Sequence, residues 1–525
     1  MRMMRMANLG IWVFVPAFMA FSAHAQTQEM PSGQTPLSVI DWLGTQGPAT
    51  TGQLPSQIPE GQQSTEPPVT KSGTPPVVTV APLGEGSPRE IGLVPTAVTG
   101  LPTDIWAGSD ADQIIKKIKD LADPTLPAAQ ALLYTVLLAE AQAPRGGVAA
   151  GDALALARVE KLVTLGALDP ALSLIEQAGV TTSPDHFDLW MQISLLNGTE
   201  DRACATLAGA PHLTRDYGTR IFCAARAGNW DNAALTFGSA QALGLMSDEK
   251  LDLIDRFLNP DAYEGAPPLR APRKMDPLSF RLFETIGEPL PTGNLARPYA
   301  VADLRDVAGW KAQLEAAERL TRLGALPDNR LLGLYTDRQA AASGGIWDRV
   351  SALQRFETAL NTGSAEAVAK TLPTVWAAMH EAGLEVSFAT LFADPLAQIP
   401  LTGRAADIAF EIALLSPAYE VASVNAQQKS LLTAIGIGEM PEKAPDDVME
   451  RAVFEAFTTA TPRADLIAGT RQKRLGESIL ILLDLLHDGA GGDAGALRDA
   501  LATLRALGLE DTARRLALQT LLLER

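Results

Sequence analysis

A short pattern that recurs at nearly constant spacing constrains the fold of this chain more than any other feature of its sequence. A glycine is followed five residues later by an alanine within Leu- and Ala-rich segments, and the first three glycines lie 32 and 30 residues apart. Glycine ends a helix at low steric cost because it adopts the left-handed conformation, and the alanine lets the next helix pack closely. The pattern therefore predicts helical hairpins that repeat about every thirty residues. The copies are Gly166 with Ala171, Gly198 with Ala203, Gly228 with Ala233, and an isolated one at Gly508 with Ala513.

The segments around these glycines resemble the inter-helix part of a tetratricopeptide repeat (TPR). In that family a glycine, an aromatic residue and an alanine recur at this spacing, and here Trp230 and Leu168 take the equivalent bulky position. The resemblance covers about 100 residues, and no single copy carries the full consensus of the family. It implies an all-α fold, an α-solenoid of antiparallel helix hairpins. The low aromatic content of 6% also favours helices packed through Ala and Leu over sheets.

Residues 1–25 have the three parts of a secretory signal peptide. Two basic residues, Arg2 and Arg5, precede an apolar run, and alanines flank His24 ahead of the expected cleavage before Gln26. An apolar run of about a dozen residues is short for a bilayer span, so we favour a cleaved leader over a membrane anchor. We therefore expect a periplasmic protein with no membrane span in its mature form.

Residues 26–100 are predicted to form a disordered arm. Pro, Gly, Ser and Thr supply 39 of these 75 residues, so helices cannot propagate and little apolar surface is left to form a core. One apolar island, at 36–43, has helical spacing and suits docking onto a groove, either of a partner or of the chain's own domain. A later island that starts at Ile91 is expected to lie along the first helices. The docking side chains of the first island are Leu37, Ile40, Trp42 and Leu43.

Helical patterns begin after the arm and continue to the end of the chain, with one interruption. We predict an N-terminal helical repeat region at 101–260 and a C-terminal helical region at 278–525. The Pro- and basic-rich residues 261–277 between them are predicted to be a linker or a long loop.

Cys204 and Cys223 are the two cysteines of the chain. They fall in successive predicted helices, with the midpoint between them near the predicted turn, and export would place them in an oxidising compartment. We predict an intramolecular disulfide that ties one hairpin. Two buried free thiols are the alternative, and a redox pair is disfavoured because the spacing is far from Cys-x-x-Cys.

The segment at 331–347 is the one least like a repeat, and the stretch at 331–349 that includes it has aromatic residues, paired glycines and opposite charges close together. Such a set can form a specific partner-binding surface, for which Tyr335, Trp347 and Arg349 are the candidates. The alternative is a tight helix junction with Trp347 packed under it.

Sequence motifs for catalysis, metal binding and nucleotide binding do not occur, so we expect no catalytic residue, no metal and no cofactor. Glu477 followed by Ser478 is similar to the start of the catalytic domain of soluble lytic transglycosylases, but the later motifs are missing and 47 residues follow. The loop at 488–493 lacks the alternating acidic ligands of a calcium loop. The histidines after the leader are far apart, at His186, His212, His380 and His487.

The formal charge of −18 argues against nucleic acid and anionic lipid as partners, because phosphate binding depends on clustered Lys and Arg. We therefore expect a scaffold or adaptor that binds another cell-envelope protein or peptide. A cell-wall or glycan-active enzyme with an unrecognised site and a purely structural envelope protein are the alternatives.

Overall fold

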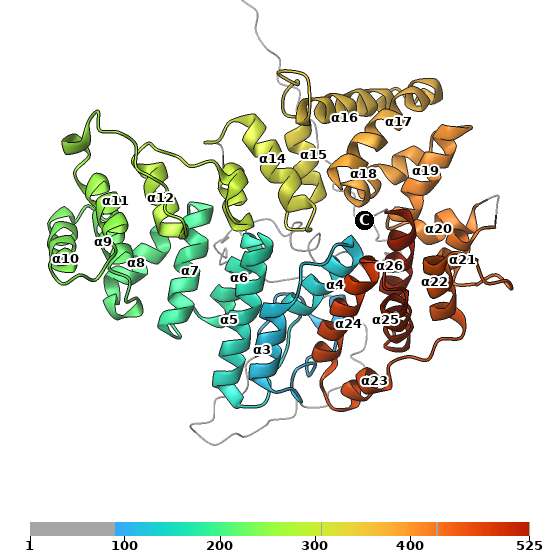
Figure 1. The fold of residues 1–525 in the computed structure, drawn as a ribbon, viewed down its shortest axis with the longest axis horizontal. Helices are drawn as coiled ribbons and strands as arrows, with labels where there is room; N and C mark the ends of the chain where they lie inside the picture. The colour runs from blue at the N-terminus through green and yellow to red at the C-terminus, as the bar shows by residue number, and fades with distance from the viewer. Residues whose placement is uncertain (1–89, 306, 427–428, 524–525) are drawn as a thin grey trace, which may run out of the picture. The chain divides into compact units, whose positions relative to one another are not determined.

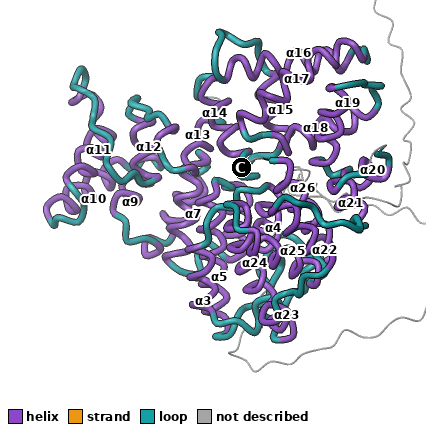
Figure 2. The backbone as a smooth tube through the Cα atoms, turned by 45° about the vertical axis from the view of Figure 1, so that its right-hand side comes forward, coloured by secondary structure: helices purple, strands orange, loops and turns teal. Residues whose placement is uncertain are grey.

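The computed structural model describes residues 90–525 except 306, 427–428 and 524–525, and this part of the chain is helical (Figure 1). Figure 2 shows helices joined by loops throughout it, and the strand-like pairings among the described residues are isolated bridges. The all-α fold class is thus confirmed for the described part. The predicted leader, the predicted arm up to residue 89 and the island at 36–43 lie outside the described residues.

The helices fall into three successive stretches of the chain. The first holds α2 (Thr96–Thr99), α3 (Ala111–Asp120), α4 (Pro127–Leu138), α5 (Gly147–Leu165), α6 (Leu168–Ala178), α7 (Pro184–Asn197), α8 (Asp201–Gly209), η1 (Pro211–Leu213), α9 (Tyr217–Arg226), α10 (Trp230–Ala242), α11 (Asp248–Leu258), η2 (Pro260–Tyr263) and α12 (Pro277–Thr285). The second holds η3 (Thr292–Asn294), η4 (Arg297–Tyr299), α13 (Ala300–Asp303), α14 (Trp310–Thr321), α15 (Asp328–Thr336), α16 (Ile346–Asn361), α17 (Ala365–Ala382), α18 (Glu385–Ala397) and α19 (Arg404–Leu415). The third holds α20 (Tyr419–Val424), α21 (Leu431–Ile437), α22 (Val448–Thr458), α23 (Ala464–Arg471), α24 (Leu475–Ala490), α25 (Ala494–Ala506) and α26 (Glu510–Leu522).

The glycine and alanine pattern marks the turns of helical hairpins. In each copy the glycine has a φ angle between 73° and 85°, and the alanine five residues later is fully buried. Across these glycines α5 packs on α6, α7 on α8, α9 on α10, and α25 on α26. The predicted role of glycine in ending one helix, and of alanine in packing the next, is confirmed at all four positions.

The two ends of the described chain pack together, unlike an open array in which each repeat contacts only its neighbours. α4 packs against α5 and also against α24 and α26, so the blue helix lies beside red ones in Figure 1. α4 buries nine of its twelve residues, because it is apolar on almost every side and needs neighbours on every side. The side chain of Gln519 in α26 accepts a hydrogen bond of 2.8 Å from the backbone N–H of Ala128. We call α4 with α24 and α26 the closing core.

The chain enters this core through the last part of the predicted arm. Ile91 and Val94 are buried. Arg158 of α5, itself enclosed, donates hydrogen bonds of 2.7 to 2.8 Å to the backbone oxygens of Ile91, Leu137 and Ala139. Burial lowers the pKa of Arg158 to about 10. Ile91 and Val94 thus pack into the core of the described chain, and the predicted domain boundaries stay predictions.

Buried apolar side chains form two groups. The larger joins residues 91–302 with residues 419–518, and the smaller holds residues 300–415 together with Leu523. The predicted break at 261–277 contains the end of η2 and the loop that leads to α12. The smaller group includes the stretch at 331–349, which carries the candidate site.

Candidate functional site

Glu318 on α14 is the centre of an ion cluster that joins α14, α15 and α16. Its side chain is 2% exposed. Arg349 on α16 binds both carboxylate oxygens, with Nε 2.8 Å from Oε1 and Nη2 2.8 Å from Oε2. The hydroxyl of Tyr335 on α15 donates a hydrogen bond to Oε1, and Nη2 of Arg322 lies 3.2 Å from Oε2. A two-pronged arginine–carboxylate pair has a fixed geometry, so the cluster sets how the three helices meet.

The start of α16 brings Arg349 to Glu318. Gly345 precedes the helix with a φ angle of 57°, a left-handed value that favours glycine. Trp347 in the first turn packs against Trp310 of α14, with ring centroids 5.2 Å apart. This contact holds the beginning of α16 against α14.

The cluster is suited to holding helices together and not to transferring protons. Burial, and then the negative charge of Glu318, raises the pKa of Tyr335, so the hydroxyl keeps its proton. Burial alone would lower the pKa of Arg349, but its hydrogen bond and attraction to Glu318 outweigh burial and raise it. Both pKa values move away from neutral pH, whereas a general acid or base needs a pKa near the working pH.

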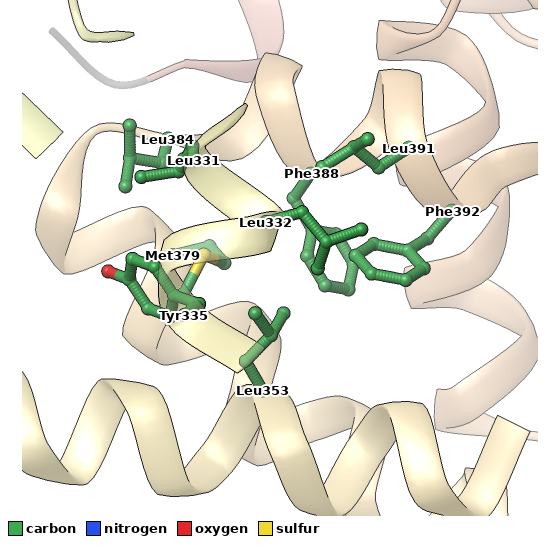
Figure 3. A pocket seen from close by; sticks show the side chains of 9 residues that line it. All are labelled: Leu331, Leu332, Tyr335, Leu353, Met379, Leu384, Phe388, Leu391 and Phe392. Atoms are coloured by element: carbon green, nitrogen blue, oxygen red, sulfur yellow. The ribbon is translucent and has the colours of Figure 1, made fainter. Parts of the chain in front are cut away.

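An apolar hollow lies beside the cluster, among α15, α16, α17 and α18 (Figure 3). It has a volume of about 260 Å³, with the open solvent at its mouth included. The rings of Phe388 and Phe392 pack together on α18, with centroids 4.8 Å apart. Tyr335 belongs to both features, because its ring lines the hollow and its hydroxyl binds Glu318. The lining side chains are Leu331, Leu332, Tyr335, Leu353, Met379, Leu384, Phe388, Leu391 and Phe392.

The hollow offers apolar surface without a reactive group. The one oxygen among the lining side chains belongs to Tyr335, and in Figure 3 it points away from Phe388 and Phe392. Pockets for small molecules usually carry several placed polar groups. This hollow lacks them, and seven of its nine lining side chains are buried, so it is a narrow apolar depression at the helix junction.

The three candidate residues of the stretch at 331–349 lie at one helix junction. Tyr335 is 1% exposed and Arg349 is bound to Glu318, while Trp347 is half-buried. This is the geometry that the tight-junction alternative predicts. Direct binding of a partner by these three residues stays a prediction. The island residues Leu37, Ile40, Trp42 and Leu43 lie outside the described residues.

Sequence reasoning missed both the acid at the centre of the cluster and the aromatic wall of the hollow. Phe388 and Phe392 are four residues apart in a helical segment, a spacing that places two side chains on one face and could have been recognised. Glu318 had no such signal. Glu315 has the same side chain on the same helix, yet it is 54% exposed.

A second buried cluster surrounds the disulfide. Cys204 in α8 and Cys223 in α9 form the bond that their spacing predicts. Glu200, at the start of α8, is fully buried, and its Oε1 lies 3.2 Å from Arg226 and 3.0 Å from Arg281. A buried carboxylate of this kind needs such partners, because its removal from water is otherwise unfavourable. The disulfide and the ion pairs together fix α8 to α9 and α12.

Glu477 is held by Arg474 at the start of α24. Nε and Nη2 of Arg474 donate to the two carboxylate oxygens at 2.9 and 2.7 Å. The hydrogen bonds from Arg474 outweigh burial and lower the pKa of Glu477. The general acid of a glycosidase needs a raised pKa, so this environment does not suit the role that a transglycosylase-like motif would give Glu477. Ser478 donates its hydroxyl to the backbone oxygen of Leu466 at 3.0 Å.

The remaining candidates for metal binding lie apart or are already used. Asp493 caps α25 by accepting a hydrogen bond of 3.0 Å from the N–H of Ala496. Within the part of the chain that the structure describes, His, Cys, Asp and Glu side chains form no group that could hold a metal ion. No described helix has both the length and the apolar character needed to cross a membrane. The histidines lie on separate elements, His186 on α7, His212 on η1, His380 on α17 and His487 on α24.

Comparisons with protein-family models, with curated proteins and with solved structures give no match to this chain.

Proposed function

We propose that this chain is an exported helical-repeat scaffold or adaptor that binds another protein of the cell envelope. In this proposal the leader at 1–25 delivers the chain to the periplasm, and its hairpins stack as a TPR-like α-solenoid whose surface holds the partner. Two observations support it. A disulfide persists in an oxidising compartment, and the four glycine turns have the backbone that hairpins require.

The apolar hollow among α15, α16, α17 and α18 carries the proposal. Leu332 and Leu391 are half-buried, so they form the part of its lining that reaches solvent. The Glu318 cluster holds the junction behind it. An apolar surface that is already ordered needs little further ordering when a partner packs an apolar side chain over it, and such anchors supply most of the binding energy of an interface.

Photo-cross-linking from the hollow tests this function. A photoreactive residue in place of Leu332 should join the chain to one envelope protein, and the purified pair should bind each other. Leu332→Gln should weaken that binding at least tenfold, because a polar side chain opposes insertion of an apolar anchor. Val421→Gln is the matched control, since Val421 is 62% exposed on α20, away from the hollow. Equal binding by both variants would rule out the hollow as the site.

Export is tested separately. Cell fractionation should place the protein in the periplasm, and mass spectrometry of its N-terminus should find Gln26 as the first residue. A cytoplasmic protein that starts at Met1 would contradict this part of the proposal without bearing on the hollow.

A further inference from the structure

α10 is a helix that the described part of the chain leaves mostly uncovered. Of its thirteen residues Ala233 and Ala240 are buried, and the helices that pack against it are α9 and α11. Leu235 is 70% exposed and Trp230 is 51% exposed. Asp231 is the one charged residue of α10. Large apolar side chains exposed on a helix with one charged residue form a surface that suits contact with another protein.

Gly238 leaves a gap on the outward face of α10, because it has no side chain. It lies in the interior of α10, where glycine is less favourable than alanine. A Cβ atom at Gly238 would meet no other atom within 4 Å, so nothing in the described fold requires a glycine there. At about 100° per residue, Leu235 and Gly238 lie on the side of α10 opposite the buried Ala233 and Ala240. The outward face therefore carries a large apolar side chain next to a position without one.

We propose that α10 is the contact helix of a homodimer, in which it pairs antiparallel with α10 of a second copy. Leu235 of each copy lies over Gly238 of the other. A two-fold axis relates the two copies, so each contact occurs twice. Leu235 of the first copy fills the gap at Gly238 of the second, and Leu235 of the second fills the gap at Gly238 of the first. The missing side chain at Gly238 admits Leu235 and lets the two helices approach closely.

Charge favours the antiparallel over the parallel orientation of the two copies. The chain has a formal charge of −18, so two copies repel each other over most of their surfaces. α10 brings Asp231 alone to the contact. In the antiparallel pair the two Asp231 residues lie about 16 Å apart along the helix axis at about 1.5 Å per residue, beyond the screening length of about 8 Å at physiological salt. A parallel pair would place them side by side.

Sedimentation equilibrium of the full chain, over a wide range of concentrations, tests the proposal. The wild-type chain should form a dimer. Leu235→Asp should weaken dimerisation at least tenfold, while its circular dichroism spectrum and its thermal unfolding temperature should match those of the wild-type monomer. Leu243→Asp is the matched control. Leu243 is 71% exposed but lies about 80° away from Leu235 around the axis, so this variant should still dimerise.

A chain that is monomeric at every concentration would overturn the proposal. The alternatives would then be that another protein binds α10 or that the chain's own residues 36–43 bind it. A dimer that Leu235→Asp does not weaken would overturn it as well. Mixed cysteine variants test the register. Leu235→Cys chains should cross-link with Gly238→Cys chains more readily than either variant with itself, and the reverse preference would reject the pairing.

Discussion

α4 and α10 both carry few charged residues but differ strongly in burial. α4 carries no charged residue and α10 carries one. Nevertheless α4 buries nine of its twelve residues, whereas α10 buries two of its thirteen. α4 is enclosed because α24 and α26, from the other end of the chain, pack on it, while α10 has α9 and α11 as its packing neighbours. A low number of charged residues is therefore compatible with both burial and exposure, and the fold decides whether the same chain covers the helix.

The difference assigns different roles to similar helices. Apolar side chains of the closing core stabilise the monomer through burial, whereas those of α10 add little to its stability and remain available for association.

A pair of leucine truncations gives the largest contrast. Leu137→Ala removes a fully buried side chain from α4 and should lower the free energy of unfolding by about 2–5 kcal/mol. Leu235→Ala in α10 should change it by less than about 0.5 kcal/mol at dilutions where the chain is monomeric. Urea unfolding followed by circular dichroism measures both. Similar losses for the two variants would mean that α10 is covered within the monomer.

Reduction of the disulfide should have the next largest effect on stability. The bond joins α8 to α9, and α9 packs against α10. Cys204 and Cys223 are 19 residues apart, and closing a loop of that length stabilises a fold by about 3 kcal/mol. Reductant should therefore lower the thermal unfolding temperature of the wild-type chain. A Cys204→Ser, Cys223→Ser double variant should be insensitive to reductant, and an unchanged wild-type temperature would show that the bond adds no stability.

Glu477, on the closing-core side, should give a smaller, pH-dependent effect. Its pKa in the folded chain lies below the ordinary value of 4.5 because Arg474 binds the charged form. Its contribution to stability is thus fully present above pH 4.5 and is lost as the pH falls through the lowered value. Glu477→Gln should destabilise the chain by about 1 kcal/mol at pH 7 and by less with increasing acidity. Glu315→Gln, at an exposed position, is the control. If the difference in free energy of unfolding between wild type and Glu477→Gln stays constant from pH 7 to pH 3, Glu477 does not have a lowered pKa in the folded chain.

Gly238→Ala should produce the smallest change in the monomer, and in the stabilising direction. Alanine favours a helix over glycine by up to about 1 kcal/mol, and the described fold leaves room for its methyl group. The same methyl group should weaken the proposed dimer, because it occupies the space meant for Leu235. Thermal unfolding at low concentration and sedimentation at high concentration separate the two effects. Loss of stability in the dilute monomer would show that Gly238 serves the fold itself.

Local features of the fold could be predicted from the sequence, and distant ones could not. The hairpin turn at Gly198 and the disulfide partners Cys204 and Cys223 lie within a few dozen residues of one another, so spacing alone carries the information. The packing of the two chain ends is different. Ala128 and Gln519 share a hydrogen bond across 391 positions, and neither local sequence specifies the other.

Part of the candidate site drew attention in the sequence for the same reason. The unusual composition at 331–349 singles out a segment that the structure places where α15 and α16 meet, and partner binding by this segment stays a prediction. The burial of Glu318 depends on Arg349, thirty-one residues later, and on how α16 begins, which residue types alone do not encode. The role of a charged residue in a helix is set by what packs over it.

Hydrogen–deuterium exchange, measured by mass spectrometry over a series of protein concentrations, tests the contrast between α4 and α10 most directly. Peptides from α4 should exchange slowly at every concentration, because the chain itself encloses that helix. Peptides from α10 should exchange fast in dilute samples and slow down as the concentration rises through the dimerisation range. Exchange in α10 that is slow and independent of concentration, or exchange in α4 as fast as in α10, would contradict the account.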